Sequence, residues 1–201
     1  MRKVILQEFL SLDGLAAGAD GSTDFIPEAN SGDKSFMDGQ LKMLEDIDTM
    51  ILGRLTYEMF ADYWPEAIHG DGEDKELEKI IGGLHKIVFS STIERAPWGD
   101  QEPGVVIKGN AADELRKIKE SPGKDIVLWG SVSLAQSLIN GGLIDEVRLV
   151  TCPSVLGDGR PFFFKKVDAL NLNLIGAKTF DRGSVELCYQ PARAAATRTA
   201  Q

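Results

Sequence analysis

The chain has 201 residues, of which 43% are hydrophobic and 26% are charged, a mixture that fits one compact globular domain and excludes a disordered or fibrous protein. Its 22 basic and 31 acidic residues give a net charge of −9. This acidic balance argues against nonspecific binding to nucleic acid or to an anionic membrane. No apolar run is long enough to span a bilayer and no signal peptide is recognised, so we expect a cytoplasmic protein.

The cysteine and histidine content argues against a metal site. Cys152 and Cys188 each lie within an apolar run, which predicts buried, reduced thiols. His69 and His85 are the only histidines of the sequence, so a zinc site built from His and Cys is not expected.

The first half of the chain alternates strand and helix patterns. Residues 4–12 predict a strand that ends at the turn pair Asp13-Gly14. Residues 15–33 predict a long loop, and loops of this length in compact domains are often functional. The pattern then predicts a helix over 34–46, a strand over 49–52, a helix over 56–60, a loop over 63–72 and a helix over 73–81 that stops at Gly82-Gly83.

The second half continues the alternation and closes with a hairpin. Strands are predicted over 85–89, 105–107, 125–129 and 147–152, with a turn-rich segment over 97–104. Helices are predicted after Asn110, a candidate N-cap, and from Val132 to the stop at Gly141-Gly142. Residues 172–180 and 184–190 flank Asp181-Arg182-Gly183, a hairpin signal. This order predicts one α/β domain over 1–191, with a mostly parallel sheet, an antiparallel C-terminal hairpin, and a disordered tail over 192–201.

Three strand ends share a pattern that suits phosphate. Each has a buried strand, a small residue, a hydroxyl or cation, and then a predicted helix, whose free N–H groups favour an anion. At the first, Gly53 permits close backbone approach, Arg54 supplies a cation and Thr56 a hydroxyl. The others are Ser90-Ser91-Thr92 and Gly130-Ser131-Val132-Ser133. Taken singly, each pattern is as well explained by a turn or a helix cap, but three together favour a dinucleotide.

A further glycine-rich segment, residues 155–161, is best explained as a loop between strands, although its glycines could also frame a substrate. None of these segments matches the P-loop pattern or a full G-x-G-x-x-G.

Taken together, the segments resemble the dihydrofolate-reductase-like superfamily, and within it the branch that includes the C-terminal reductase domain of bifunctional riboflavin-biosynthesis proteins. The resemblance rests on an ordered set that covers nearly the whole chain: Ser11-Leu12-Asp13-Gly14, residues 52–58, 87–90 and 122–126, Gly130-Ser131, residues 142–146, and residues 153–162 with Leu156-Gly157-Asp158-Gly159 at their centre.

The resemblance implies a three-layer fold and a reductase that uses NAD(P)H, with NADPH favoured over NADH. It implies that the helix starts at Gly53-Arg54-x-Thr56 and at Gly130 to Leu134 flank the cofactor pyrophosphate. It also implies that Ser90, Ser91 and Thr92 lie near the adenosine 2′-phosphate. The turn Leu12-Asp13-Gly14 would border the nicotinamide and the substrate.

The proton donor and the substrate are less well defined. Dihydrofolate reductases carry a carboxylate on the first helix, and the nearest acids here are Asp24, Glu28, Asp33 and Asp38. We take Asp24 and Tyr57 as the candidate catalytic residues, with water as an alternative donor. The riboflavin-type reductase has an acidic residue before its glycine turn, and Trp129 holds that place here.

Aromatic residues near the expected cleft could hold a flat substrate. Phe25, Trp64 and Trp129 could sandwich a pterin-like or pyrimidine-like ring, or a carbonyl compound, although core packing explains each one singly. We therefore expect hydride transfer from NADPH to such a substrate. The alternatives are a non-catalytic protein that binds NADP or a flavin-like molecule, and a structural subunit. The apolar hairpin over 172–190 suits a homodimer interface, although it could equally serve only to complete the sheet.

Overall fold

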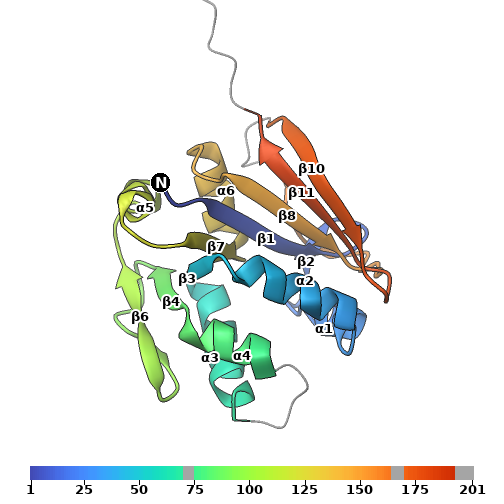
Figure 1. Cartoon of the computed structure of the whole chain (residues 1–201), viewed down its shortest axis with the longest axis horizontal. Helices are drawn as coiled ribbons and strands as arrows, with labels where there is room; N and C mark the ends of the chain where they lie inside the picture. The colour runs from blue at the N-terminus through green and yellow to red at the C-terminus, as the bar shows by residue number, and fades with distance from the viewer. Residues whose placement is uncertain (70–74, 164–169, 193–201) are drawn as a thin grey trace, which may run out of the picture.

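A nine-stranded sheet runs through the molecule in the order β10-β11-β8-β1-β7-β3-β4-β6-β5 (Figure 1). The computed structural model describes residues 1–69, 75–163 and 170–192. The strands are β1 (Val4–Leu10), β3 (Ile47–Gly53), β4 (His85–Phe89), β5 (Ala96–Trp98), β6 (Gln101–Ile107), β7 (Asp125–Trp129), β8 (Glu146–Thr151), β10 (Leu172–Thr179) and β11 (Val185–Pro191). The pairs from β8 to β6 are parallel, whereas β10, β11 and β5 pair antiparallel with their neighbours. The predicted fold class is therefore confirmed, including the closing hairpin.

Helices cover both faces of this sheet, which gives the predicted three layers (Figure 1). On one face, α5 (Ala111–Glu120) and α6 (Val132–Asn140) pack on the strands through a core that includes Leu115 and Leu138. On the other face lie α2 (Lys34–Leu44), α3 (Arg54–Ala67) and α4 (Lys75–Gly83). The short elements α1 (Phe25–Asn30), β2 (Leu15–Gly18) and β9 (Gly159–Pro161) complete the fold, and β2 pairs with β9.

Local sequence signals explain most of these boundaries. Beyond the polar residues at their amino ends, the central strands β3 and β7 are apolar on both faces and almost wholly buried, as expected for parallel strands covered by helices on each side. The side chain of Asn110 accepts hydrogen bonds from the N–H groups of Ala112 and Asp113, so it caps α5 as predicted.

Four predicted irregular segments contain secondary structure. The expected loop over 15–33 contains β2 and α1, and the expected loop from residue 63 is partly the end of α3, which continues through Pro65 to Ala67. The turn-rich segment over 97–104 contains most of β5 and the start of β6, and the glycine-rich segment over 155–161 contains β9. These strands are short or lie at a sheet edge, where neighbouring elements rather than the local pattern determine the conformation. The predicted tail falls almost wholly on residues 193–201, outside the described residues.

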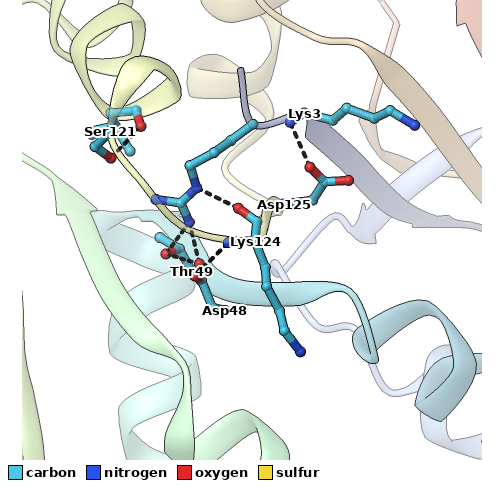
Figure 2. A network of polar contacts seen from close by, with 8 residues as sticks. Lys3, Asp48, Thr49, Ser121, Lys124 and Asp125 are labelled. Atoms are coloured by element: carbon cyan, nitrogen blue, oxygen red, sulfur yellow. Dashed lines mark hydrogen bonds and ion pairs between the residues drawn. The ribbon is translucent and has the colours of Figure 1, made fainter.

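The amino ends of the central strands are joined by a polar network (Figure 2). The guanidinium of Arg2 pairs with Asp48 and donates to Thr49 Oγ1 at 2.6 Å and to the carbonyl of Lys124. Asp48 also accepts from the N–H of Lys124 at 2.8 Å. The first residues of the chain are thereby fixed to β3 and to the turn before β7, at the edge opposite the candidate site.

A buried acid lies in the middle of the sheet. Glu8 on β1 is 7% exposed, and its Oε2 has no hydrogen-bond partner among the described residues. Burial raises the pKa of Glu8 to about 8, and a hydrogen bond from the N–H of Phe9 opposes this only in part. The folded protein therefore holds a proton on Glu8 at neutral pH, whereas the unfolded chain releases it.

We expect this buried acid to make stability depend on pH. Folding raises the pKa of Glu8, so its protonation contributes to the free energy of unfolding. This contribution is complete below about pH 4.5 and is lost as the pH rises through about 8. Between pH 5 and pH 8 the loss is on the order of 3 kcal/mol. Urea unfolding of Glu8→Gln should show no such decrease in the free energy of unfolding between pH 5 and pH 8. The exposed control Glu102→Gln should still show it. A wild-type pH profile for Glu8→Gln would contradict the burial argument.

Candidate active site

The candidate site lies where two adjacent parallel strands end. β3 and β7 are hydrogen-bonded neighbours, and at their carboxyl ends lie Gly53 and Trp129. The helices α3 and α6 begin directly after these ends, at Arg54 and Val132. Two helix N-termini are thus brought together at one edge of the sheet, as the sequence predicted for the first and third of its strand ends.

Direct contact joins these two helix starts. A Cβ placed on Gly53 would lie 2.1 Å from Oγ of Ser131, and one on Gly130 would lie 2.8 Å from Oγ1 of Thr56. The N–H of Ser131 donates to Thr56 Oγ1 at 2.8 Å. Glycine is therefore required at both positions because side chains from the other helix start occupy the space that a Cβ would need.

The turn before α6 has an unusual backbone. Gly130 has φ 55°, and Ser131, with φ 54°, is the one non-glycine residue with positive φ among the described parts of the chain. Such conformations cost energy and concentrate at functional sites. Among the described residues, neither Gly53 nor Ser131 makes a side-chain cap hydrogen bond to its helix. No N-cap side chain therefore occupies the first N–H groups of α3 and α6, and such uncapped groups favour an anion.

The other cofactor candidates of α3 and α6 differ in their surroundings. Arg54 is about half exposed, and its Nη1 lies 2.9 Å from both carboxylate oxygens of Glu58 one turn later. Ser133 is exposed at the start of α6, whereas Leu134 is partly buried and packs against the core. Arg54 is thus a cation at the helix start whose charge is partly balanced within the chain.

The remaining predicted strand end differs from expectation. β4 ends at Phe89 beside Gly53 of β3, so Ser90, Ser91 and Thr92 lie at the same edge of the sheet. The Oγ of Ser90 accepts from the N–H groups of Thr92 at 3.2 Å and Ile93 at 3.3 Å, which forms a compact turn. The segment leads into the strand β5 and not into a helix, so the expected helix start here is wrong. The hydroxyl of Ser90 bonds to backbone N–H groups within the same turn, as is common for serine in turns.

The turn Leu12-Asp13-Gly14 is joined to the loop that precedes β9. The carboxylate of Asp13 accepts from the N–H groups of Leu156 at 3.2 Å and Gly157 at 2.8 Å. Hydrogen bonds from Ser11 and from the N–H of Gly157 lower the pKa of Asp13 to about 2. Leu12 is 67% exposed beside this junction. Asp13 therefore stays ionised at neutral pH and fixes the two loops against each other.

The candidate proton donors lie in contrasting settings. Asp24 is exposed at the start of α1. Tyr57 is 6% exposed, packs beside Trp98, and its hydroxyl donates to the carbonyl of Pro97 at 2.8 Å. Burial raises the pKa of Tyr57, so this phenol holds its proton in a hydrogen bond to the outer strand β5.

The acids near α2 have structural partners. Burial acts to raise the pKa of Asp33, but hydrogen bonds from Ser35 and the N–H of Phe36 outweigh it, so the pKa is lowered. Asp33 caps α2, and Asp38 pairs with Lys34 on its surface.

The candidate substrate aromatics are mostly packed. Phe25 is 4% exposed and lies in a small cluster with Ala29 and Cys152. Trp64 makes edge contacts with Phe60 and Tyr63. Trp129 is 6% exposed, lies beside Phe60, and donates its indole N–H to Gln7 Oε1 at 2.7 Å.

Sequence reasoning missed the polar residues behind Trp129. Gln7 is 1% exposed on β1, and it donates to Gln40 of α2 at 3.0 Å. A signal was present, because an amide followed by an acid in an otherwise apolar strand is unusual for a buried parallel strand.

Other features do not add to this site. Two depressions of about 420 and 400 Å³ both include His85 and lie at the amino ends of β3 and β4, away from the helix starts. Within the described residues no group of His, Cys, Asp or Glu could hold a metal ion, and no helix is long and apolar enough to cross a membrane.

The arrangement is that of an α/β protein with paired helix starts at the carboxyl edge of a mostly parallel sheet. More specifically, the chain belongs to the RibD C-terminal domain family, whose model matches residues 2–185.

Relatives in Bacillus subtilis extend over nearly the whole chain. YyaP is 36% identical over 189 residues, which cover 94% of each chain. YwjB is 30% identical over 189 residues, covering 94% of this chain and 97% of YwjB. Both are described as uncharacterized proteins.

Solved structures share the fold at low sequence identity. A Shewanella sp. PV-4 protein named for riboflavin biosynthesis has a TM-score of 0.72 at 22% identity, covering 95% of this chain and 99% of its own. The Thermotoga maritima deaminase and 5-amino-6-(5-phosphoribosylamino)uracil reductase has a TM-score of 0.62 at 15% identity, covering 95% of this chain and 57% of its own. Dihydrofolate reductase from Enterococcus faecalis, solved with NADP(H), has a TM-score of 0.52 at 14% identity, covering 94% and 96%.

We expect Gly53→Ala to destabilise the protein by about 2 kcal/mol, because the new methyl group would overlap Ser131 Cβ and Oγ. Gly83→Ala is the matched control, since nothing lies within 4 Å of its added Cβ. Ser131→Gly should restore most of the loss in the double variant, because it removes the overlapping atoms. Denaturant unfolding measures all four proteins, and equal stability of the two alanine variants would contradict the close approach.

Proposed function

We propose that the chain is an NADPH-dependent reductase that transfers hydride to a small heteroaromatic or carbonyl substrate. The observation that carries this proposal is the contact between the starts of α3 and α6, where the N–H of Ser131 meets Thr56 Oγ1 at 2.8 Å. Two helix starts without a side-chain cap at one sheet edge suit a pyrophosphate, since each favours negative charge. The NADP(H) bound to the dihydrofolate reductase of Enterococcus faecalis supports the same cofactor class.

The charge distribution explains how an acidic protein would hold this cofactor. With a net charge of −9, long-range attraction of an anion is absent, so binding depends on local N–H groups and on Arg54. Ser90, Ser91 and Thr92, at the end of β4 next to β3, supply hydroxyls for the 2′-phosphate in this proposal. The turn at Leu12 to Gly14 borders the nicotinamide.

Chemistry at the site would come mostly from the cofactor. Bound NADPH supplies the hydride, and the protein orients the substrate ring and excludes water. Because Tyr57 donates its hydroxyl hydrogen to Pro97, we favour Asp24 or water as the proton source. A cytoplasmic location fits the free thiols of Cys152 and Cys188.

A direct test combines binding with turnover. A thermal shift with NADPH larger than with NADH would support the cofactor assignment, because a ligand that binds the native state raises its stability. Loss of reduced-nicotinamide absorbance with pterins, pyrimidines or carbonyl compounds would support the reductase. Binding without turnover on any of these would instead identify a non-catalytic NADP-binding protein, and absence of binding would overturn both.

We expect Arg54→Ala to weaken NADPH binding about tenfold, as for the loss of one charge-assisted hydrogen bond. Glu58→Gln should strengthen binding because it frees the Arg54 guanidinium from its partner carboxylate. Lys34→Ala is the control, since it breaks an equivalent i,i+4 pair with Asp38 on α2. Calorimetric titration with NADPH measures each variant, and unchanged affinity in Arg54→Ala would exclude the phosphate role.

We also propose a homodimer formed through the β10–β11 hairpin. Leu174 and Ile175 on β10 are 57% and 55% exposed, and no strand of the described residues pairs with the outer side of β10, which favours pairing of this apolar edge with a second copy.

In this proposal, Leu174→Asp combined with Ile175→Asp shifts the protein from dimer to monomer, since it places charge on the apolar edge. Val105→Asp is the control, because Val105 is 61% exposed near the opposite edge of the sheet. Light scattering after size-exclusion chromatography gives the mass. A monomeric wild-type protein at tens of micromolar would refute the dimer.

A further inference from the structure

The buried acid Glu8 lies beside the start of α6. On the paired strands β1 and β7, Gln7 is level with Trp129, and the next residues along the two chains are Glu8 and Gly130. Neighbouring strands of a sheet are about 5 Å apart. Glu8 is therefore next to the Gly130-Ser131 turn from which α6 begins.

The side chain of Glu8 lies on the face of the sheet that α6 covers. Leu6 and Leu10, two residues before and after Glu8 on β1, pack with Ala135 and Leu138 of α6 in one core cluster (Figure 1). Alternate residues of a strand share a face, so the Glu8 carboxyl lies in the same layer. An acid is thus enclosed between the sheet and the helix whose N-terminus belongs to the candidate site.

The Glu8 carboxyl has no ionic partner to balance a charge. It is 7% exposed, and burial raises its pKa to about 8, opposed only by the N–H of Phe9. The helix α6 contains no titratable residue, and Glu146 and Arg148 of β8 lie on the opposite face, level with Ile5 and Gln7. The other titratable groups around this layer are Tyr189 of β11, Asp125 at the amino end of β7, the Lys119–Asp145 pair, and the exposed Arg160 of β9.

A charge on Glu8 would act on the start of α6. This helix start has no side-chain cap, and its N–H groups favour negative charge. A carboxylate beside them would be stabilised by the same positive end that favours a phosphate, and it would repel that phosphate. At the effective dielectric constant of a protein, two like charges about 10 Å apart can change an affinity about tenfold.

We propose that Glu8 makes cofactor binding depend on pH, because the neutral acid permits an anion at the start of α6 whereas its carboxylate repels that anion. This inference rests on the proposed NADPH site. Glu8 acts here through its charge and touches neither the cofactor nor the substrate. Affinity is then complete while Glu8 is protonated and falls as the pH rises through about 8.

Linkage gives this coupling a second, reciprocal readout. If the carboxylate weakens NADPH binding about tenfold, bound NADPH raises the pKa of Glu8 by about one unit. At pH 8 about half of the free protein carries this proton, whereas nearly all of the complex does. Binding at pH 8 should therefore take up about 0.4 proton per NADPH.

Calorimetric titration with NADPH tests both consequences. Affinity should fall about fivefold between pH 7 and pH 9, a range in which a phosphate with a second pKa near 6 stays ionised. Titrations at pH 8 in two buffers of different ionisation enthalpy give the proton uptake. A merely structural role of Glu8 would change neither the pH profile nor the uptake.

Variants assign the effect to this one carboxyl. Glu8→Gln keeps the size of the side chain without its charge, so it should bind NADPH as the wild type does at pH 7 and lose the Glu8 share of the uptake and of the fivefold fall. Glu8→Leu is a second neutral variant for the same comparison, in case the amide is poorly accommodated. The exposed control Glu102→Gln should behave as the wild type does.

The outcomes separate this inference from the cofactor proposal. Wild-type affinity that is equal at pH 7 and pH 9, or an unchanged fall and uptake in a folded neutral variant, would overturn only the role of Glu8. Absence of NADPH binding by the wild type at pH 7 would overturn both proposals. Urea unfolding at pH 7 and pH 9 shows that each protein is folded where its affinity is measured.

Discussion

The contact between Gly53 and Ser131 is the constraint on which the site depends. A Cβ on Gly53 would lie 2.1 Å from Ser131 Oγ, so the turn after β7 can pass this close to the end of β3 only because residue 53 is glycine. The strained φ of 54° at Ser131 directs its N–H to Thr56 and starts α6 beside α3. Strain of this kind persists only where surrounding structure enforces it, and here the hydrogen bond and the buried strands do so.

This geometry compensates for the charge of the protein. A chain with 31 acidic and 22 basic residues repels anions at a distance, so affinity for the dinucleotide proposed above would have to arise at close range. Backbone N–H groups at helix starts provide donors without adding mobile charge, and they need little rearrangement on binding. The pair between Arg54 and Glu58 fits the same arrangement, because it holds a cation at the site while balancing its charge.

The sequence predicted the elements whose signals are local. The β7 strand over 125–129, the Asn110 cap and the hairpin around Asp181 to Gly183 were all predictable, because apolar runs, caps and turns depend on neighbouring residues. The residue types after each strand predicted helix starts at Gly53 and Gly130 that would suit an anion. The contact between the two helix starts was not predictable, since it joins residues far apart in the chain. The Ser90 turn resembled a helix start because its hydroxyls serve a turn and a cap equally well.

The strand β1 shows most clearly what the sequence pattern alone does not predict, namely which buried polar side chains find partners. Gln7 and Glu8 are adjacent and both buried, yet alternation along the strand directs them to opposite helical layers. Gln7 is satisfied through Trp129 and Gln40, whereas Glu8 keeps an unpaired oxygen and a raised pKa. Packing alone would favour aliphatic residues at both positions in a central parallel strand. The polar pair therefore lowers stability at the centre of the sheet, and such departures from the packing rule are expected at functional or strained sites.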